Sequence, residues 1–225
     1  MGRVVLVSDV QTPLGEELAR RYLAEGASVA VTRSNQKSRE SPLVSESDGF
    51  LLTDWNRRSP ISARNVLLSV VNRFGRIDEA VVLHDPAVKA SLLPEAPYDS
   101  IERAVDSWLK GTLFLVKGLL EVLARDGAGR LALVEYAPRQ AVASRPPVEA
   151  ALRGAFKALT DSLLETGGPK GVAVHAFESV ATLARDFAGF IVETLIARGD
   201  KPSGKWLRFQ PRSGLLSPLR GLMGS

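Results

Sequence analysis

Ionisable side chains gather where the buried strands of this chain are expected to end. His84 and Asp85 follow the apolar run 80–83, and His175 follows the run 172–174. The same places along the chain hold Glu135, Tyr136, Arg145, Glu149 and Glu178. Histidine titrates near neutral pH, so these groups could together form an acid/base site at one edge of a sheet. The simpler interpretation, which we favour, is the ordinary polar lining of a crevice.

The elements that must position these residues begin within the first thirty-odd residues. The run 4–7 is apolar and β-branched, which is typical of a strand buried on both faces. A polar turn covers 8–13, and residues 14–25 have apolar positions at helical spacing up to Gly26. A second apolar run, 29–32, predicts another strand. Such strand–helix–strand units open nucleotide-binding α/β domains.

The rest of the chain continues this alternation. Further strands are predicted at 50–52, 80–83, 131–134, 172–174 and 206–209, and further helices at 61–74, 98–125, 148–164 and 187–198. Right-handed crossovers would join these strands into a parallel sheet. We therefore expect an α/β fold with a doubly wound, seven-stranded parallel sheet and helices on both faces. A single domain is expected over 1–209, with a tail over 210–225.

Composition narrows the possible classes of function. The chain has 225 residues, of which 45% are hydrophobic and 24% charged, as in ordinary globular proteins. It has no cysteine and two distant histidines, so we expect no metal site and no thiolate chemistry. The net charge of +4 comes from scattered arginines, which predicts no nucleic-acid partner. Neither a membrane-length apolar stretch nor a signal peptide is visible, so a cytoplasmic protein without membrane contact is expected.

The order of the landmarks resembles the short-chain dehydrogenase/reductase family of nicotinamide-dependent Rossmann-fold enzymes. The resemblance spans residues 3–209 and rests on Leu14-Gly15, Arg33, Asp54 and the segments 74–78, 109–112, 129–131 and 165–174. It implies a cofactor site whose remaining contacts are Ser8, Gly15, Arg33 and Asp54. An arginine at position 33 would favour NADP in this family, and Asp54 would lie near adenine. For Arg33, a solvated arginine at the end of a strand is an equally good interpretation. For Asp54, we favour a turn residue before Trp55.

The glycine-rich turn of the family is largely lost. Its three glycines correspond to Asp9, Pro13 and Gly15, so that only the last is kept. Asp9 brings a negative charge near the expected path of the pyrophosphate, and Pro13 removes a backbone N–H that could face a phosphate. The family's Asn-Asn-Ala-Gly segment corresponds to residues 82–85, which do not match it.

The resemblance also implies that the catalytic tetrad is replaced. Its asparagine, serine, tyrosine and lysine correspond to Trp108, Tyr136, Arg145 and Glu149. An arginine does not exchange protons near neutral pH. No tyrosine in the chain is followed four residues later by a lysine, whatever the alignment. The family's substrate lid is short as well, and we expect Trp108 to fill the vacated space as an apolar plug.

These observations predict a catalytically inactive member of the family with a structural, assembly or ligand-binding role. No cofactor is expected, and NADP is the best candidate if one binds. One alternative is an NADP-linked oxidoreductase with Tyr136 or His84 as its proton donor, and another is a nucleotide or metabolite sensor. Family members commonly pair the helices corresponding to 98–125 and 148–164, which implies a homodimer, a homotetramer or a heteromer with an active member.

Overall fold

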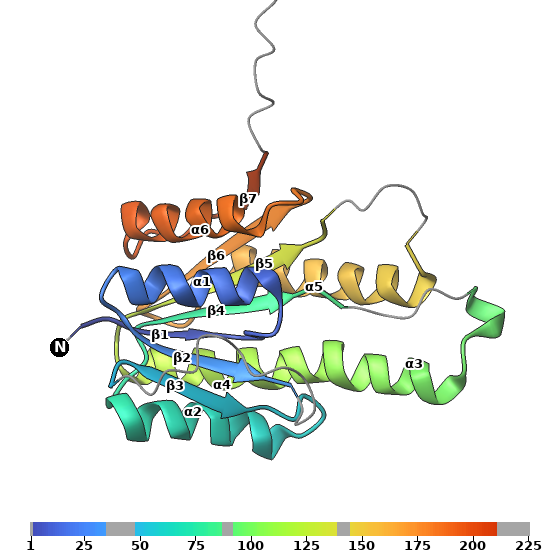
Figure 1. Cartoon of the computed structure of the whole chain (residues 1–225), viewed down its shortest axis with the longest axis horizontal. Coiled ribbons are helices and arrows are strands. Elements are labelled where there is room, and N and C mark those ends of the chain that lie inside the picture. Colours follow the sequence, from blue (N-terminus) through green and yellow to red (C-terminus); the bar gives the residue numbers. More distant parts are fainter. Residues whose placement is uncertain (1, 35–47, 87–91, 139–144, 211–225) are drawn as a thin grey trace, which may run out of the picture.

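Seven parallel strands form one sheet in the order β3-β2-β1-β4-β5-β6-β7 (Figure 1). The computed structural model describes residues 2–34, 48–86, 92–138 and 145–210. The strands are β1 (Val4–Val7), β2 (Ser28–Arg33), β3 (Phe50–Asp54), β4 (Glu79–His84), β5 (Gly129–Tyr136), β6 (Val172–Ser179) and β7 (Trp206–Phe209). The predicted doubly wound sheet is therefore confirmed. Of the predicted tail, only Gln210 lies within the described residues.

Helices cover both faces of the sheet. Figure 1 shows α1 (Pro13–Ala24) and α6 (Ala184–Arg198) on one face, and α2 (Pro60–Phe74), α4 (Gly111–Arg125) and α5 (Pro147–Thr166) on the other. Successive side chains of a strand point to opposite faces. Val5 and Val7 accordingly join the core under α1 and α6, whereas Val4 and Leu6 join the core under α2 and α4. No helix in these described ranges is long and apolar enough to cross a membrane.

The starts of α1 and α2 have the same local signature. In α1, the Thr12 side chain accepts a hydrogen bond from the backbone N–H of Gly15, and Pro13 occupies the first turn. In α2, the side chain of Ser59 accepts from the N–H of Ser62 in the same way. These caps set where the loops after β1 and β3 end, and both loops lie at the carboxyl edge of the sheet.

The stretch 98–125, predicted as one helix, contains a widened turn. α3 (Tyr98–Ala104) runs into a π-helical segment, η2 (Val105–Lys110), which continues as α4. A short 3₁₀ turn, η1 (Leu93–Glu95), precedes them. Trp108 lies within η2, and the hydroxyl of Thr112 donates to its carbonyl at 2.7 Å. Segments of this kind are rare and often lie at functional sites.

His175 does not stand at the end of its strand, which corrects our prediction. β6 continues to Ser179 because it pairs with β5 along its whole length and with β7 from Ala176 to Ser179. His175 therefore lies mid-strand and is completely buried. Only residues 180–183 separate β6 from α6, so the segment that would form a lid is short, as predicted.

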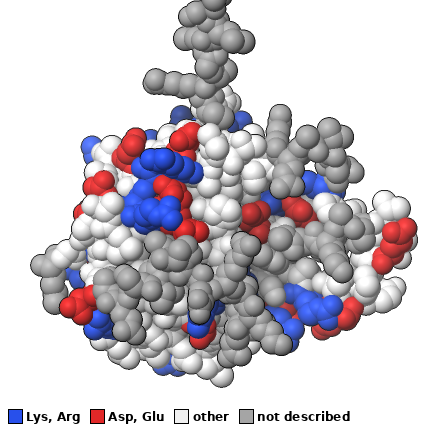
Figure 2. All heavy atoms as spheres, viewed as in Figure 1, with Lys and Arg blue, Asp and Glu red and all other residues white. Residues whose placement is uncertain are grey.

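Charged groups of both signs are mixed on the surface. Figure 2 shows basic and acidic side chains interspersed over the visible face instead of a continuous basic field. On α1, for example, Arg20 pairs with Glu16 at 2.7 Å and with Glu17 at 2.8 Å. The absence of a nucleic-acid partner stays a prediction.

Candidate functional site

A buried ion pair occupies the carboxyl edge above β1. The Asp9 carboxylate, where we expected the first glycine of the family's turn, accepts a hydrogen bond from the guanidinium of Arg57. Both side chains are about 5% exposed. Asp9 has a φ of 57°, a left-handed conformation that glycine adopts more easily than aspartate. The Arg57 guanidinium therefore compensates the negative charge that Asp9 brings to this turn.

Two indole rings enclose the guanidinium of Arg57. Its central carbon lies 4.2 Å from the ring centroid of Trp55 and 4.0 Å from that of Trp108. Nε and Nη1 of Arg57 are buried and have no hydrogen-bond partner among the described residues. Burial lowers the pKa of Arg57 to about 9, which leaves it charged at neutral pH. Trp108 is thus a stacking partner of a cation and not the purely apolar plug that we expected.

Hydrogen bonds within the protein use most backbone amides of the turn after β1. The N–H of Asp9 donates to the hydroxyl of Thr32, and the N–H of Val10 donates to the carbonyl of the same residue. The N–H of Gly15 donates to the Thr12 hydroxyl. A Cβ on Gly15 would lie 2.2 Å from the Asp9 carbonyl oxygen, so the glycine allows α1 to start against the turn. The hydroxyl of Ser8 is also engaged within the protein, because it accepts a hydrogen bond from the N–H of Leu83 at 2.8 Å.

The two residues expected at the adenine end neutralise each other. Nε of Arg33 donates to the Asp54 carboxylate at 2.6 Å, and this bond raises the pKa of Arg33. A hollow of about 670 Å³ lies next to them and is lined by Ser34, Asp54, Trp55, Asn56, Arg57, Arg58, Arg103, Ser107 and Trp108. The four predicted cofactor contacts thus lie along one edge of the sheet, with Arg33 and Asp54 engaged with each other.

Arg153, which no sequence motif identified, holds the acidic residues of the cleft together. It is 6% exposed, and its guanidinium donates to Glu149 at 2.8 Å, to Asp85 at 2.9 Å and to the carbonyl of Tyr136 at 3.2 Å. Glu135 lies 3.7 Å away. Burial raises the pKa of both Asp85 and Glu135, although the charge of Arg153 opposes this effect. The i,i+4 spacing of Glu149 and Arg153 was the one local signal for this cluster.

The other residues that we expected at the tetrad positions lie in different surroundings. Arg145 lies 4.0 Å from Glu149 and is about half exposed. Tyr136 packs on Phe187 under α6, and its hydroxyl donates to the carbonyl of Thr182 at 3.4 Å. Burial raises the pKa of Tyr136. The structure therefore brings Arg145 and Glu149 together but turns the Tyr136 ring to the opposite face of the sheet.

His84 is enclosed by aromatic rings. Its imidazole stacks on Phe156 with a centroid distance of 4.2 Å and meets Trp108 edge-on at 5.6 Å. Burial, assisted by the charges of Arg153 and Arg57, lowers the pKa of His84 to about 3. The ring is neutral at physiological pH and 1% exposed, so it forms part of the core beneath the crevice.

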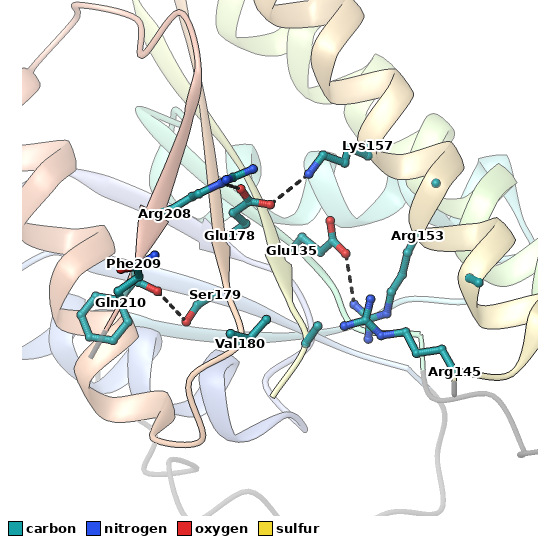
Figure 3. Close-up of a pocket in the computed structure, with 13 residues that line it drawn as sticks. Glu135, Arg145, Arg153, Lys157, Glu178, Ser179, Val180, Arg208, Phe209 and Gln210 are labelled. Carbon is teal, nitrogen blue, oxygen red and sulfur yellow. Dashed lines mark hydrogen bonds and ion pairs between the residues drawn. The ribbon is translucent and has the colours of Figure 1, made fainter. Parts of the chain in front are cut away.

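An open cavity remains on the other side of Arg153, between α5 and the ends of β5, β6 and β7. We call it the α5 cavity; its volume is about 440 Å³, and it is lined by Glu135, Ala137, Arg145, Ala150, Arg153, Gly154, Lys157, Glu178, Ser179, Val180, Arg208, Phe209 and Gln210 (Figure 3). Glu178 binds Lys157 at 3.0 Å and also pairs with Arg208. Burial would raise the pKa of Glu178, but these two bonds outweigh it and lower the pKa. Of the predicted cleft residues, Glu135, Arg145 and Glu178 line this cavity.

Solved structures of dehydrogenases and reductases share this fold. A 3-ketoacyl-(acyl-carrier-protein) reductase from Brucella melitensis, complexed with NADH, superposes with a TM-score of 0.77 at 17% identity, covering 92% of this chain and 96% of that one. Serine dehydrogenase from Escherichia coli gives a TM-score of 0.72 at 19% identity, covering 92% and 97%. At such identities these likenesses establish the fold alone.

Sequence comparisons identify the family. The short chain dehydrogenase/reductase astE of Aspergillus oryzae is 25% identical over 78% of this chain and 69% of its own length. The (2S)-[(R)-hydroxy(phenyl)methyl]succinyl-CoA dehydrogenase subunit BbsC of Thauera aromatica is 25% identical over 77% of this chain and 70% of its own length. A family model described as enoyl-(acyl carrier protein) reductase matches residues 10–191, most of the chain. The chain therefore belongs to the short-chain dehydrogenase/reductase family.

Proposed function

We propose that this protein is a family member without hydride-transfer activity that acts as a binding or assembly subunit. It would work as its own dimer or tetramer, or beside an active member of the family. The observation that carries the proposal is the buried Asp9–Arg57 pair between Trp55 and Trp108, at the turn where the family holds a pyrophosphate.

The residues at this turn do not fit a dinucleotide. An incoming pyrophosphate would meet the Asp9 carboxylate, whose only close cation among the described residues is already bound to it. Displacing Arg57 would leave a buried carboxylate beside a second anion, which is strongly unfavourable. The helix N-terminus offers little in exchange, because Thr12 caps α1 and Pro13 has no N–H.

The tetrad positions support the same conclusion. Neither Arg145 nor Glu149 can reproduce a tyrosine whose pKa is lowered by a lysine. Arg153 holds Glu149 in an ion pair, so this carboxylate is engaged in structure. One relative, BbsC, is itself named as a subunit of a dehydrogenase, which is the kind of role proposed here.

Direct titration with NADPH and NADH tests the proposal. Trp55 and Trp108 lie beside the turn, so energy transfer from tryptophan to reduced nicotinamide would report a bound cofactor. We expect no saturable binding up to about 1 mM, a concentration that corresponds to only about 4 kcal/mol of binding free energy. An intact family member serves as the positive control.

A double variant, Asp9→Gly with Arg57→Gln, tests the cause. Removing both charges restores a glycine at the turn and leaves no carboxylate to repel the pyrophosphate. We expect this variant to bind NADPH more tightly than the wild-type protein does. Micromolar binding by the wild type, together with turnover of any carbonyl substrate, would contradict the proposal.

The alternative is an NADP-linked oxidoreductase with an unusual proton donor. The relatives named as dehydrogenases, and the Brucella reductase complexed with NADH, favour it. Against it, His84 is neutral and enclosed by rings, and the hydroxyl of Tyr136 points toward Thr182. The same titration separates the two functions.

A further inference from the structure

We propose that the α5 cavity is a binding site for a small organic monocarboxylate with an apolar body. The inference rests on the binding role proposed above and names the ligand for it. It assumes that the ligand binds without a nicotinamide, whereas a substrate for hydride transfer would need a nicotinamide beside the cavity. Four features support it: the size of the cavity, its apolar wall, its cations and the balance of its charges.

The size and the wall of the cavity suit a small molecule. Its volume of about 440 Å³ lies in the usual range for ligand pockets. Ala137, Ala150, Gly154, Val180 and Phe209 provide apolar surface along it. Val180 is 43% exposed, which is unusual for a valine directly after a core strand and leaves its side chain free to contact a ligand.

Two arginines at the cavity have donors to spare. Figure 3 shows Arg145 beside Arg153 at one end of the cavity, and Lys157 and Arg208 both reaching Glu178 at the other. Among the described residues, Arg145 has a carboxylate only at 4.0 Å and makes no hydrogen bond. Arg208 binds Glu178 through Nε alone, so its two terminal nitrogens stay available. A guanidinium presents paired N–H groups that match the two oxygens of a carboxylate.

The charge balance favours a single negative charge. Arg145, Arg153, Lys157 and Arg208 face two lining carboxylates, Glu135 and Glu178. Arg153 is also saturated by Asp85 and Glu149, and Glu149 lies near Arg145 as well. These four cations and four carboxylates balance, so the cluster has no surplus positive charge to hold a dianion such as a phosphate monoester. A single carboxylate suits it better, because the N–H groups of Arg145 and the terminal nitrogens of Arg208 have no hydrogen-bond partner among the described residues.

Calorimetric titration of the full chain with octanoate tests the inference. Octanamide is the matched neutral probe, and acetate is the probe that lacks the apolar body. We expect octanoate to bind in the absence of nucleotide, and octanamide and acetate to bind at least tenfold more weakly. Equal binding of octanoate and octanamide, or no binding of octanoate, would overturn the inference.

Variants locate the site. Arg145→Gln and Arg208→Gln should each weaken octanoate binding several-fold, and together at least tenfold. Arg73→Gln, a like change on α2 away from the cavity, is the matched control and should leave the affinity unchanged; circular dichroism verifies folding of each variant. Equal affinity in the double variant, or binding that requires NADPH, would also overturn the site. The titration with NADPH alone tests the proposed function independently, so failure of the carboxylate site and failure of the proposed function can be told apart.

Discussion

Arg57 and Arg58 are neighbours in sequence with opposite environments. The side chain of Arg57 is 5% exposed, paired with Asp9 and stacked between two indoles, whereas Arg58 is exposed. A buried ion pair contributes little net stability, but losing one partner leaves the other charge buried without compensation. Replacing Arg57 therefore tests the Asp9–Arg57 pair, and the same replacement at Arg58 serves as its control.

We expect Arg57→Ala to lower the free energy of unfolding by about 3–5 kcal/mol, because Asp9 becomes an unpaired buried charge. Arg58→Ala should change it by no more than about 0.5 kcal/mol. Urea denaturation followed by circular dichroism measures both. In the double variant with Asp9→Ala, the loss should be smaller than the sum of the single losses. Equal effects of the two arginine variants would contradict this account.

His84 and His175 predict how stability depends on pH. Burial lowers their pKa values to about 3 and about 4, from about 6.5 in an unfolded chain. At a pH between the folded-state and the unfolded-state pKa of each histidine, the unfolded chain binds a proton that the folded protein does not. Stability contributed by the neutral rings is complete above pH 6.5 and is lost as the pH falls toward 4, by at most about 1.4 kcal/mol per pH unit for each histidine.

Replacing one histidine isolates its share of this effect. The slope of unfolding free energy against pH, measured by urea denaturation from pH 7.5 to 4.5, should become shallower in His175→Leu than in the wild type. Titrating carboxylates affect both proteins alike, so the comparison removes them. An unchanged slope would mean that His175 does not stay neutral in the folded state.

At the scale of elements, two helical glycines have opposite expected effects. An added Cβ at Gly154 in α5 meets no atom within 4 Å. An added Cβ at Gly111, at the start of α4, would lie 2.5 Å from the carbonyl oxygen of Arg57. Gly111 thus lets α4 pack directly on the loop that carries Arg57 and so helps to position the Asp9–Arg57 pair.

Within a single subunit, we expect Gly154→Ala to stabilise the fold by about 0.5–1 kcal/mol, since alanine favours a helix over glycine. Gly111→Ala should destabilise it by about 1–3 kcal/mol, because backbone atoms must move apart. Thermal unfolding measures both changes. A loss of stability in Gly154→Ala would point to close contact with another chain at α5.

At the scale of the whole molecule, α5 presents small residues outward. Ala151, Gly154 and Ala158 are exposed and lie at helical spacing, so they share one face of the helix. On α4, Leu113 is 41% exposed. These surfaces belong to the helices expected to pair between subunits.

We expect the purified protein to form a dimer or tetramer, and Ala158→Arg to shift it toward the monomer. Leu68→Arg on α2, at a leucine that is 46% exposed, is the matched control and should leave the mass unchanged. Light scattering coupled to size-exclusion chromatography gives the masses. A monomeric wild type would contradict the homomeric form of the proposal, and co-purification with an intact family member would then test the heteromeric form.

Local pattern was sufficient for most of the fold. Runs such as 4–7 and 131–134 are apolar without a break, as strands buried on both faces must be, and each proved to be a strand. Thr12-Pro13 marks the start of α1, and Gly75 ends α2 with a φ of 83°. These features depend on residues a few positions apart, which a sequence displays directly.

The end of β6 was not predictable from the local sequence pattern. The apolar run suggested a strand of three residues, yet β6 continues through His175 to Ser179 because hydrogen bonds from β5 and β7 extend it. The same applies to the π-helical turn at Trp108, since a helical apolar pattern continues across it unchanged. Both outcomes depend on neighbours that are distant in sequence.

Patterns along the chain were enough to predict a doubly wound α/β domain and to show that no tyrosine is followed four residues later by a lysine. The contacts made at the carboxyl edge of the sheet became visible only in the folded chain. Asp9 and Arg57 are 48 positions apart, and nothing near Arg57 in sequence separates it from Arg58. The energy of a buried charge depends on which partners reach it in space, so the Asp9–Arg57 pair and the contacts of Arg153 emerge only when the strands are placed side by side.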